Sequence, residues 1–290
     1  MKGSFKYLTT GEEDINWGLY LNVVGNAQIQ PGTLYPPREH PSGYYFEWAT
    51  GRVLHEYQLV YITEGAGIFE NKHGKYHVKP GCIFIIFPNE WHRYQPVKRT
   101  GWIENYVGFS GKIADELLKN PVSSPTQPVI QCGIKEEIID TYYKIFDLVE
   151  KERPGFQQIA SGMVVKLLGY IISFQKQKGF SGKPIAKVIE EIRFIMRQNC
   201  DKEMNLEKLA ADHNVGYSYF RKMFKRYTGV SPGQYHLQLR VMRAKEMLVS
   251  SDKSIKEISF ELGFQTIHYF SLIFKKKVGM TPSEFRKRTN

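Results

Sequence analysis

The chain has 290 residues, 42% of them hydrophobic, and carries a formal net charge of +11. This length fits two domains, and this apolar content allows packed cores, which excludes a disordered chain. The longest apolar run, Cys82–Phe87, is far shorter than a membrane span, and the first residues lack the apolar stretch of a secretory signal. We therefore expect a cytoplasmic protein with no membrane partner.

The positive charge is concentrated in the last third of the chain. Residues 184–290 hold 20 Lys and Arg against 11 Asp and Glu, a net charge of +9, whereas residues 1–183 carry only +2. A basic domain that follows a nearly neutral one indicates a polyanionic partner for the basic domain. Charge alone leaves open the alternative of a solvated basic surface without a partner.

The cysteines indicate neither a metal site nor a disulfide framework. Cys82, Cys132 and Cys200 lie far apart, are odd in number and form no C-x-x-C pair. We expect three reduced thiols, and no metal or other cofactor.

Residues 43–108 are rich in short aromatic and β-branched segments, such as "HEYQLVYIT" and "CIFIIF", separated by Gly, Pro and charged turns. This spacing predicts an antiparallel sandwich or barrel. From residue 112 the period becomes helical, and we predict a short helix at 112–120 and longer helices at 135–151 and 156–178.

The last of these helices carries an apolar stripe. The stripe has two possible interpretations, packing on the β-domain or a dimer interface, and the pattern alone does not choose between them. Its members are Ile159, Met163, Leu167, Tyr170, Ile171 and Phe174. The following segment, "KGFSGKP", is polar with two glycines and predicts a linker. The expected boundaries are therefore 1–111 for the β-domain, 112–178 for the helices, 179–183 for the linker and 184–290 for the basic domain.

The basic domain contains one structural unit twice. Tyr219-Phe220, Phe224-Lys225 and Gly229 recur exactly 50 residues later, as Tyr269-Phe270, Phe274-Lys275 and Gly279. Ser231-Pro232 and Thr281-Pro282 keep the same offset, and each precedes a Gln or Glu suited to a capping box, as Ser254 precedes Glu257. These signals predict a duplicated helix–turn–helix unit whose preceding helices end at the two glycines.

At about 100° per residue, each repeat presents one apolar face and one polar or basic edge. A helix with such an edge fits the DNA major groove, where base edges carry a distinguishing pattern of donors and acceptors. The candidate base contacts are Ser218, Arg221, Lys222, His268, Ser271 and Leu272. Later, more basic positions suit phosphates, although each could be a plain solvated residue; they are Lys225, Arg226, Lys275, Lys276 and Lys277.

The segment "IKEISFELGFQTIHYFSLIFKKKVGMTPSEFRKR", residues 255–288, closely resembles the C-terminal signature of the AraC-type transcription regulators. The resemblance covers about residues 184–288. It implies two helix–turn–helix subdomains joined by a long helix over residues 232–250, with recognition helices that start near Gly216 and Gln265. It also places the base contacts at the positions named above and at Ile267, which the helical periodicity puts on the buried face and which we therefore leave out.

The segment "YQLVYITEGAGIFENKHGKYHVKPGCIFIIFPNEWHRYQP", residues 57–96, resembles the cupin-like sensor barrel of sugar-responsive AraC-type regulators. By position, the resemblance implies effector contacts at Tyr94, Glu104 and Tyr106. Aromatic faces stack on sugars and polar tips bind their hydroxyls, so His92, Tyr57 and Tyr61 join the candidate effector site. The resemblance also favours dimerisation for the apolar stripe.

The resulting prediction is an α+β protein: an N-terminal cupin-like β-barrel with dimerisation helices, then an all-α domain of two helix–turn–helix subdomains. The implied function is a ligand-responsive transcription regulator, an activator of a carbohydrate-utilisation operon. Its implied partners are double-stranded DNA, a sugar, RNA polymerase and a second copy of the chain.

Two alternatives remain at this point. A cupin-type sugar-modifying enzyme would need a metal triad, but His73 and His77 are four residues apart and His92 stands alone, so we expect no enzyme. The other alternative is a constitutive DNA-binding protein whose barrel has lost its ligand.

Overall fold

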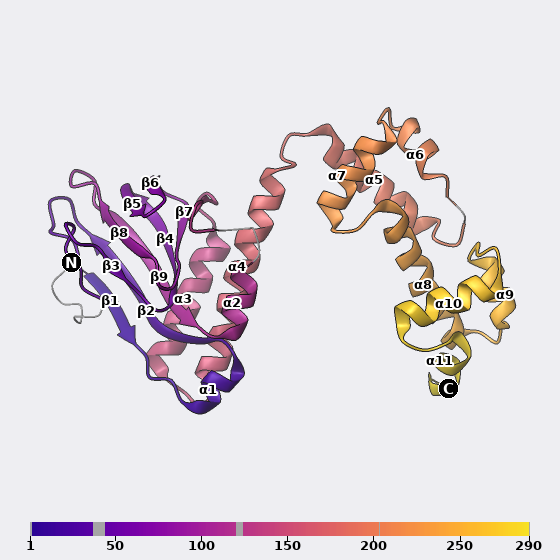
Figure 1. Cartoon of the computed structure of the whole chain (residues 1–290), viewed down its shortest axis with the longest axis horizontal. Coiled ribbons are helices and arrows are strands. Elements are labelled where there is room, and N and C mark those ends of the chain that lie inside the picture. The colour runs from indigo at the N-terminus through magenta and orange to yellow at the C-terminus, as the bar shows by residue number, and fades with distance from the viewer. Residues whose placement is uncertain (1, 37–43, 120–123, 203, 290) are drawn as a thin grey trace. The chain divides into compact units, whose positions relative to one another are not determined.

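The computed structural model describes residues 2–36, 44–119, 124–202 and 204–289. It divides into two compact units, Met1–Lys178 and Gly179–Asn290 (Figure 1). Short parts of the predicted barrel and of the loop before the longer helices, residues 37–43 and 120–123, lie outside the described residues.

The first unit is built on two antiparallel sheets. The larger has the strand order β1-β2-β9-β4-β7-β10 and the smaller β3-β8-β5-β6. The strands are β1 (Lys2–Tyr7), β2 (Tyr20–Ile29), β3 (Arg52–Val53), β4 (Tyr57–Gly65), β5 (Gly67–Asn71), β6 (Gly74–Val78), β7 (Cys82–Ile86), β8 (Trp91–Pro96), β9 (Trp102–Ser110) and β10 (Val129–Gln131).

The larger sheet is buried on both faces, because successive side chains of a strand point to opposite sides. On β4, Val60 and Ile62 pack between the sheets with Phe69 and Phe84, and the core there is aromatic. On the same strand, Leu59 faces the other way, into a second core shared with the helices. This alternation decides which side chains can reach an interior pocket.

Helices cover the outer face of the larger sheet (Figure 1). They are α2 (Lys112–Leu118), α3 (Glu136–Lys151) and α4 (Phe156–Lys178), while the short α1 (Glu12–Trp17) precedes β2 and buries none of its residues. The buried Gln157 side chain ties α4 to β2: it accepts from the Leu21 amide at 2.9 Å and donates to the Leu21 carbonyl at 3.1 Å. Strand β1 pairs with β2 only as far as Val23, and beyond that point the Gln157 amide satisfies both backbone groups of Leu21.

The apolar stripe of α4 is mostly core. Leu167 and Ile171 are buried, and Met163, Tyr170 and Phe174 are partly buried against the same cluster. Ile159 differs, because 55% of it is exposed. Within the described residues, no helix is both long and apolar enough to cross a membrane.

The β-structure extends beyond the segment that periodicity indicated. Strands β1 and β2 lie before residue 43, and β10 lies between the helices predicted at 112–120 and 135–151. The burial of β2 does not alternate cleanly, since Val23, Val24 and Gly25 are all buried. Periodicity therefore gave a weak signal for this strand.

The second unit is all-helical. Its helices are α5 (Pro184–Gln198), α6 (Leu206–Asp212), α7 (Tyr217–Thr228), α8 (Pro232–Ser250), α9 (Ile255–Glu261), α10 (Ile267–Val278) and α11 (Pro282–Thr289). One core holds α5, α6 and α7, and another holds α9 and α10. Residues of α8 join both cores, so α8 is the long connecting helix that the sequence predicted. Phe180, within the predicted linker, is buried in the first of these cores.

The predicted helix boundaries in this unit are confirmed. Ser231 and Ser254 each form a capping box, with Gln234 and Glu257. Thr281 forms the same reciprocal pair: its amide donates to the Glu284 carboxylate at 2.7 Å, and its hydroxyl accepts from the Glu284 amide at 3.3 Å. Gly229 and Gly279 end α7 and α10 with the same left-handed φ of 88°.

Candidate DNA interface and effector pocket

Helix α7 is held by its aromatic face. Phe220 and Phe224 are fully buried in the first helical core, with Met223 between them. The opposite edge therefore faces solvent, and it exposes Ser218, Arg221 and Lys222. Within the described part of the chain, neither Arg221 nor Lys222 makes an ion pair, so both charges are available to an anionic partner.

Helix α10 repeats this arrangement in the second core. Phe270 and Phe274 are fully buried there, 50 residues after Phe220 and Phe224. The outward edge exposes His268 and Leu272, the latter by 56%, whereas Ser271 is half-buried. The N-cap of α10 is Thr266, whose hydroxyl accepts from the Tyr269 amide at 3.1 Å.

The last turns of both helices are basic and exposed. They carry Lys225 and Arg226 on α7 and Lys275, Lys276 and Lys277 on α10. The guanidinium of Arg226 lies 5.8 Å from the centre of the Phe180 ring, so part of this side chain packs on its own unit. The three lysines of α10 and Lys225 extend into solvent, which suits phosphate contacts.

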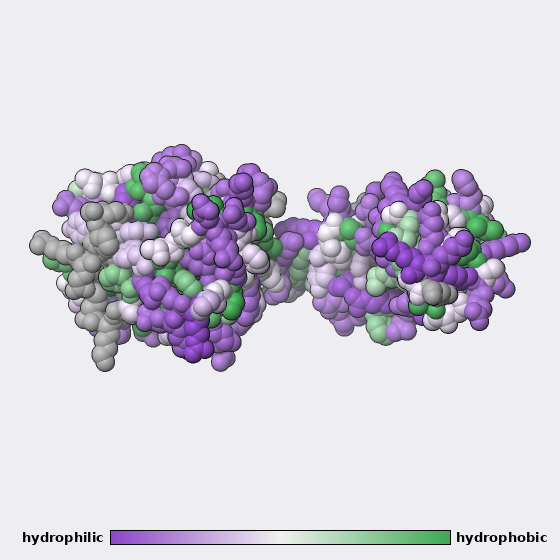
Figure 2. Space-filling model, turned by 90° about the horizontal axis from the view of Figure 1, so that it is seen from below, coloured by the Kyte–Doolittle hydropathy of each residue, from purple (hydrophilic) through white to green (hydrophobic). Residues whose placement is uncertain are grey.

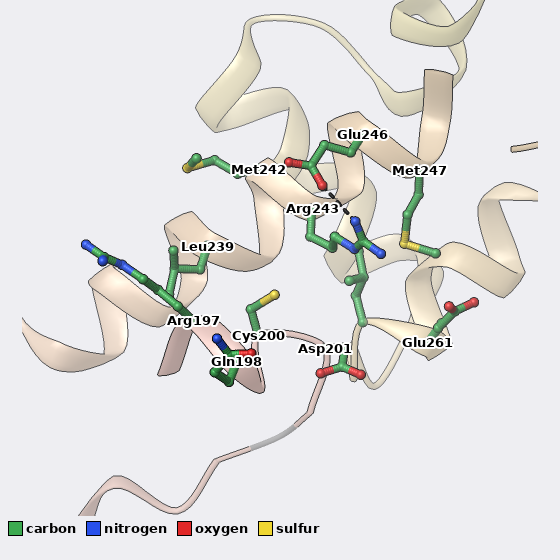
Figure 3. Close-up of a pocket in the computed structure, with 11 residues that line it drawn as sticks. Arg197, Gln198, Cys200, Asp201, Leu239, Met242, Arg243, Glu246, Met247 and Glu261 are labelled. Atoms are coloured by element: carbon green, nitrogen blue, oxygen red, sulfur yellow. Dashed lines mark hydrogen bonds and ion pairs between the residues drawn. The ribbon is translucent and has the colours of Figure 1, made fainter. Parts of the chain in front are cut away.

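On the face that Figure 2 shows, the helical unit is mostly hydrophilic, with scattered apolar side chains. A groove of about 400 Å³ lies between the end of α5, the middle of α8 and the end of α9 (Figure 3). Its charges are of both signs, and the Arg243 guanidinium is paired with Glu246 at 2.8 Å. These polar side chains are exposed, so the groove lacks the buried polar groups typical of a ligand site.

The first unit holds a polar pocket between its two sheets, and three of the predicted effector residues line it. Tyr94 comes from β8, and Glu104 and Tyr106 come from β9. The remaining lining residues are Tyr7, Tyr35, Pro36, Tyr44, Phe46, Arg52 and Gln58. The space left between these side chains is about 20 Å³, which is room for about one water molecule.

Arg52 fills much of this pocket. Its Nη2 donates to the Tyr94 hydroxyl at 2.7 Å, and its Nε donates to Nε2 of His92 at 3.2 Å. Its Nη1 donates to the Tyr44 carbonyl. The guanidinium also lies 4.9 Å from the centre of the Phe46 ring. Arg52 thus joins aromatic faces and hydrogen-bonding groups at one point.

Glu104 is a buried carboxyl group beside this arginine. Its Oε2 accepts from the Tyr35 hydroxyl at 3.0 Å. Burial raises the pKa of Glu104 to about 7, and the Tyr35 hydrogen bond and the Arg52 charge oppose that rise. Burial also raises the pKa of Tyr94 and Tyr106, so both hydroxyls stay protonated near neutral pH and can donate as well as accept.

The other three predicted effector residues do not line the pocket. Tyr57 and Tyr61 lie on the opposite face of β4 from Gln58, in the core shared with the helices. Tyr61 donates to the Gly133 carbonyl at 2.9 Å, and Tyr57 donates to Asp115 at 3.1 Å. The period of two along a strand accounts for this placement, so the geometry does not support these two tyrosines as effector contacts.

His92 lies behind the pocket. It is buried and stacks on Tyr94, with 6.2 Å between ring centres. Its Nδ1 lies 3.0 Å from the Glu90 carbonyl, and burial lowers the pKa of His92 to about 3. The neutral ring thus accepts from Arg52 through Nε2 and holds the arginine in place.

Sequence reasoning missed the residues that complete the pocket. Arg52 lies on a strand of only two residues, too short for any alternation to be read. Tyr35 and Tyr44 lie outside the named strands, so no periodicity marked them. Among the described residues, no group of three or more His, Cys, Asp or Glu could hold a metal ion.

Comparison with known proteins matches each of the two units to a known type of domain. The family model of the AraC-like ligand binding domain matches residues 28–167, and that of a helix-turn-helix domain matches residues 209–288. The MmsAB operon regulatory protein of Pseudomonas aeruginosa is 25% identical over 239 residues, which are 80% of this chain and 76% of that protein.

Other curated relatives span similar lengths. The Msm operon regulatory protein of Streptococcus mutans is 26% identical over 80% of this chain and 84% of its own. The transcriptional activator RhaR of Cronobacter sakazakii is 23% identical over 81% of this chain and 86% of its own. Among solved structures, the C-terminal domain of AraT from Geobacillus stearothermophilus aligns with a TM-score of 0.35 and 29% identity, over 37% of this chain and 88% of that one.

The chain has a ligand-binding β-domain followed by a double helix–turn–helix domain. Its relatives align with about 80% of its length. This combination is that of a ligand-binding transcription regulator. The chain belongs to the AraC-type family of transcription regulators. It is a ligand-responsive, DNA-binding regulator with an α+β fold, as the sequence predicted.

The raised pKa of Glu104 leads to a prediction for stability. Because its pKa is about 7 in the folded chain and near 4.5 when exposed, the folded state binds more protons between these values. The free energy of unfolding of the first unit should therefore fall as the pH rises through this window, by about 3 kcal/mol from this group. Urea denaturation at a series of pH values measures this fall. Glu104→Gln should flatten it, and parallel curves for the two proteins would contradict the assignment.

Proposed function

We propose that the chain is a sugar-responsive activator that binds a specific DNA operator through α7 and α10, with no catalytic activity of its own. The observation that carries this proposal is the matched exposure of the two recognition helices. Buried phenylalanines fix each helix in its own core, and the candidate base contacts lie on the opposite edge at equivalent positions; all of them are polar or basic except Leu272.

The base contacts in this proposal are Ser218, Arg221, Lys222, His268, Ser271 and Leu272, all of them exposed or half-buried. The phosphate contacts are Lys225, Arg226, Lys275, Lys276 and Lys277. The phosphate contacts supply a salt-dependent affinity that is independent of sequence, and the base contacts supply selectivity.

A sugar suits the pocket of the first unit. The pocket combines aromatic faces with a carboxyl group, a guanidinium and several phenol hydroxyls, which can together bind a polyol. Its present space is too small for a sugar, so the effector must displace side chains, and Arg52 is the one that fills it most directly. A ligand that binds only the rearranged pocket shifts the population of the chain toward that state.

An activator that acts as a homodimer and contacts RNA polymerase completes the proposal. The RhaR relatives are named as activators and two other relatives as operon regulatory proteins, which supports activation of an operon. That this operon serves carbohydrate utilisation rests on the suitability of the pocket for a sugar. For the second copy, α4 exposes a row of residues opposite its buried stripe, at spacings of three and four: Ile159, Gly162, Lys166 and Gly169. This row includes the one exposed residue of the predicted stripe.

The phosphate contacts can be tested by salt dependence. Lys225→Ala or Lys275→Ala should weaken binding to all DNA sequences alike and lower the slope of log K against log salt by about 1 each, because each removes one phosphate contact. Fluorescence anisotropy with a specific and a random duplex measures both effects. The control is Lys72→Ala, a lysine of the first unit paired with Glu90 at 2.7 Å, which should leave the slope unchanged. An equal effect of all three substitutions would contradict the proposed interface.

The effector site can be tested by thermal unfolding of the full chain with a panel of mono- and disaccharides. A bound sugar should raise Tm in a concentration-dependent way. Tyr94→Phe and Glu104→Gln should each raise the Kd of that sugar about tenfold or more, since each removes a buried hydrogen-bonding group. Tyr57→Phe, on the opposite sheet face, should leave it unchanged. If no sugar shifts Tm at millimolar concentration, the sugar assignment is wrong.

A further inference from the structure

The two recognition helices share one frame, so their side chains can be compared position by position. Both have 12 residues, and in both the amide of the final glycine donates at 2.8 Å to a lysine carbonyl, Lys225 in α7 and Lys275 in α10. Both are fixed by two fully buried phenylalanines at equivalent positions. Arg221 therefore corresponds to Ser271, and Lys222 corresponds to Leu272.

The base-reading edges of the two helices differ in chemistry. The edge of α7 carries two cations, Arg221 and Lys222, which make no ion pair within the described residues. Guanine presents two acceptors in the major groove, O6 and N7, and a guanidinium can bind both at once. An exposed arginine and lysine at adjacent positions thus favour a G·C pair.

The edge of α10 carries no cation at the equivalent positions. Leu272 is 56% exposed and apolar, and Ser271 is half-buried. A leucine cannot bond the guanine acceptors and would remove water from them, which is unfavourable. The thymine methyl group is the apolar feature of the major groove, and a leucine can pack against it. This edge thus favours an A·T pair.

The difference is confined to the base-reading positions. Lys225 and Lys275 occupy equivalent positions, and each helix carries further cations in its last turn. Both subdomains can therefore hold the DNA backbone in a similar way. Two of the three base-reading pairs differ in charge, namely Arg221 against Ser271 and Lys222 against Leu272. At the third pair, Ser218 and His268 are both exposed polar residues. The two pairs that differ in charge therefore distinguish the sequences that the two helices contact.

We propose that one chain reads an asymmetric operator, with a guanine-containing block under α7 and an A·T block, contacted through a thymine methyl group, under α10. This inference rests on the proposed function, because it requires both helices to enter the major groove. It adds an orientation: the order of the two blocks along the DNA fixes the direction in which a chain is bound.

The experiment selects bound sequences from random duplexes with the full chain and then exchanges the two edges. R221S/K222L gives α7 the side chains of α10, and S271R/L272K does the reverse. R221S/K222L should remove the guanine preference from one block, with a loss of about 5- to 150-fold on the selected operator, and leave the A·T block unchanged. S271R/L272K should create a guanine preference in the second block. A misfolded protein could not produce this gain.

The possible outcomes separate this inference from the function it rests on. If the unmodified chain binds all duplexes alike, the sequence-specific function itself is wrong. If it selects a defined operator that has guanine requirements in both blocks or in neither, the function stands and the asymmetry is wrong. The asymmetry is also wrong if exchanging one edge alters the preference in both blocks.

Discussion

The burial of paired phenylalanines in two separate cores is the constraint on which the DNA-binding half of this protein depends. Phe220 and Phe224 fix α7, and Phe270 and Phe274 fix α10, and all four are fully buried. Truncation of a buried Phe typically costs about 3–5 kcal/mol, so each helix has one strongly preferred rotation about its axis. The same burial that stabilises each subdomain therefore decides which residues of α7 and α10 are exposed and, in the proposed function, available to DNA. The long helix α8 contributes to both cores and joins the two edges.

A corresponding constraint shapes the sensor half. The larger sheet is covered on both faces, so each strand sends alternate side chains to the helices and to the pocket. Glu104 and Tyr106 face the pocket together because they are two residues apart on β9. Arg52 is held among them by Tyr94, His92 and Phe46. In the proposed function, an effector that enters this pocket has to displace Arg52, so that ligand binding and rearrangement of the pocket are coupled.

More of the DNA-binding unit than of the ligand-binding unit could be predicted from the sequence. The duplication supplied two aligned copies of each signal, and the capping boxes at Ser231 and Ser254 formed as predicted, because caps depend on local residues alone. In the sensor, Tyr57 and Tyr61 were assigned to the pocket by residue type, whereas sheet register placed them on the other face. Arg52 was missed because its position depends on contacts between segments far apart in the chain. The sequence pattern of α4 could not tell a core-facing stripe from an interface with a second chain. In the structure, most of the stripe packs against the larger sheet and belongs to the core.

The most direct test of the account is the dependence of affinity on the spacing between the two blocks of DNA that one chain reads. Because α8 belongs to both cores, the two recognition helices should be held at one separation, suited to successive major grooves about 10–10.5 base pairs apart. Insertion of five base pairs between the blocks would rotate one of them to the opposite side of the duplex. We expect this insertion to weaken binding at least tenfold, and we expect a full-turn insertion not to restore affinity, because the second block is then on the correct side of the duplex but beyond the reach of the second helix. Equal affinity at every spacing would show that the two helices do not read one duplex together.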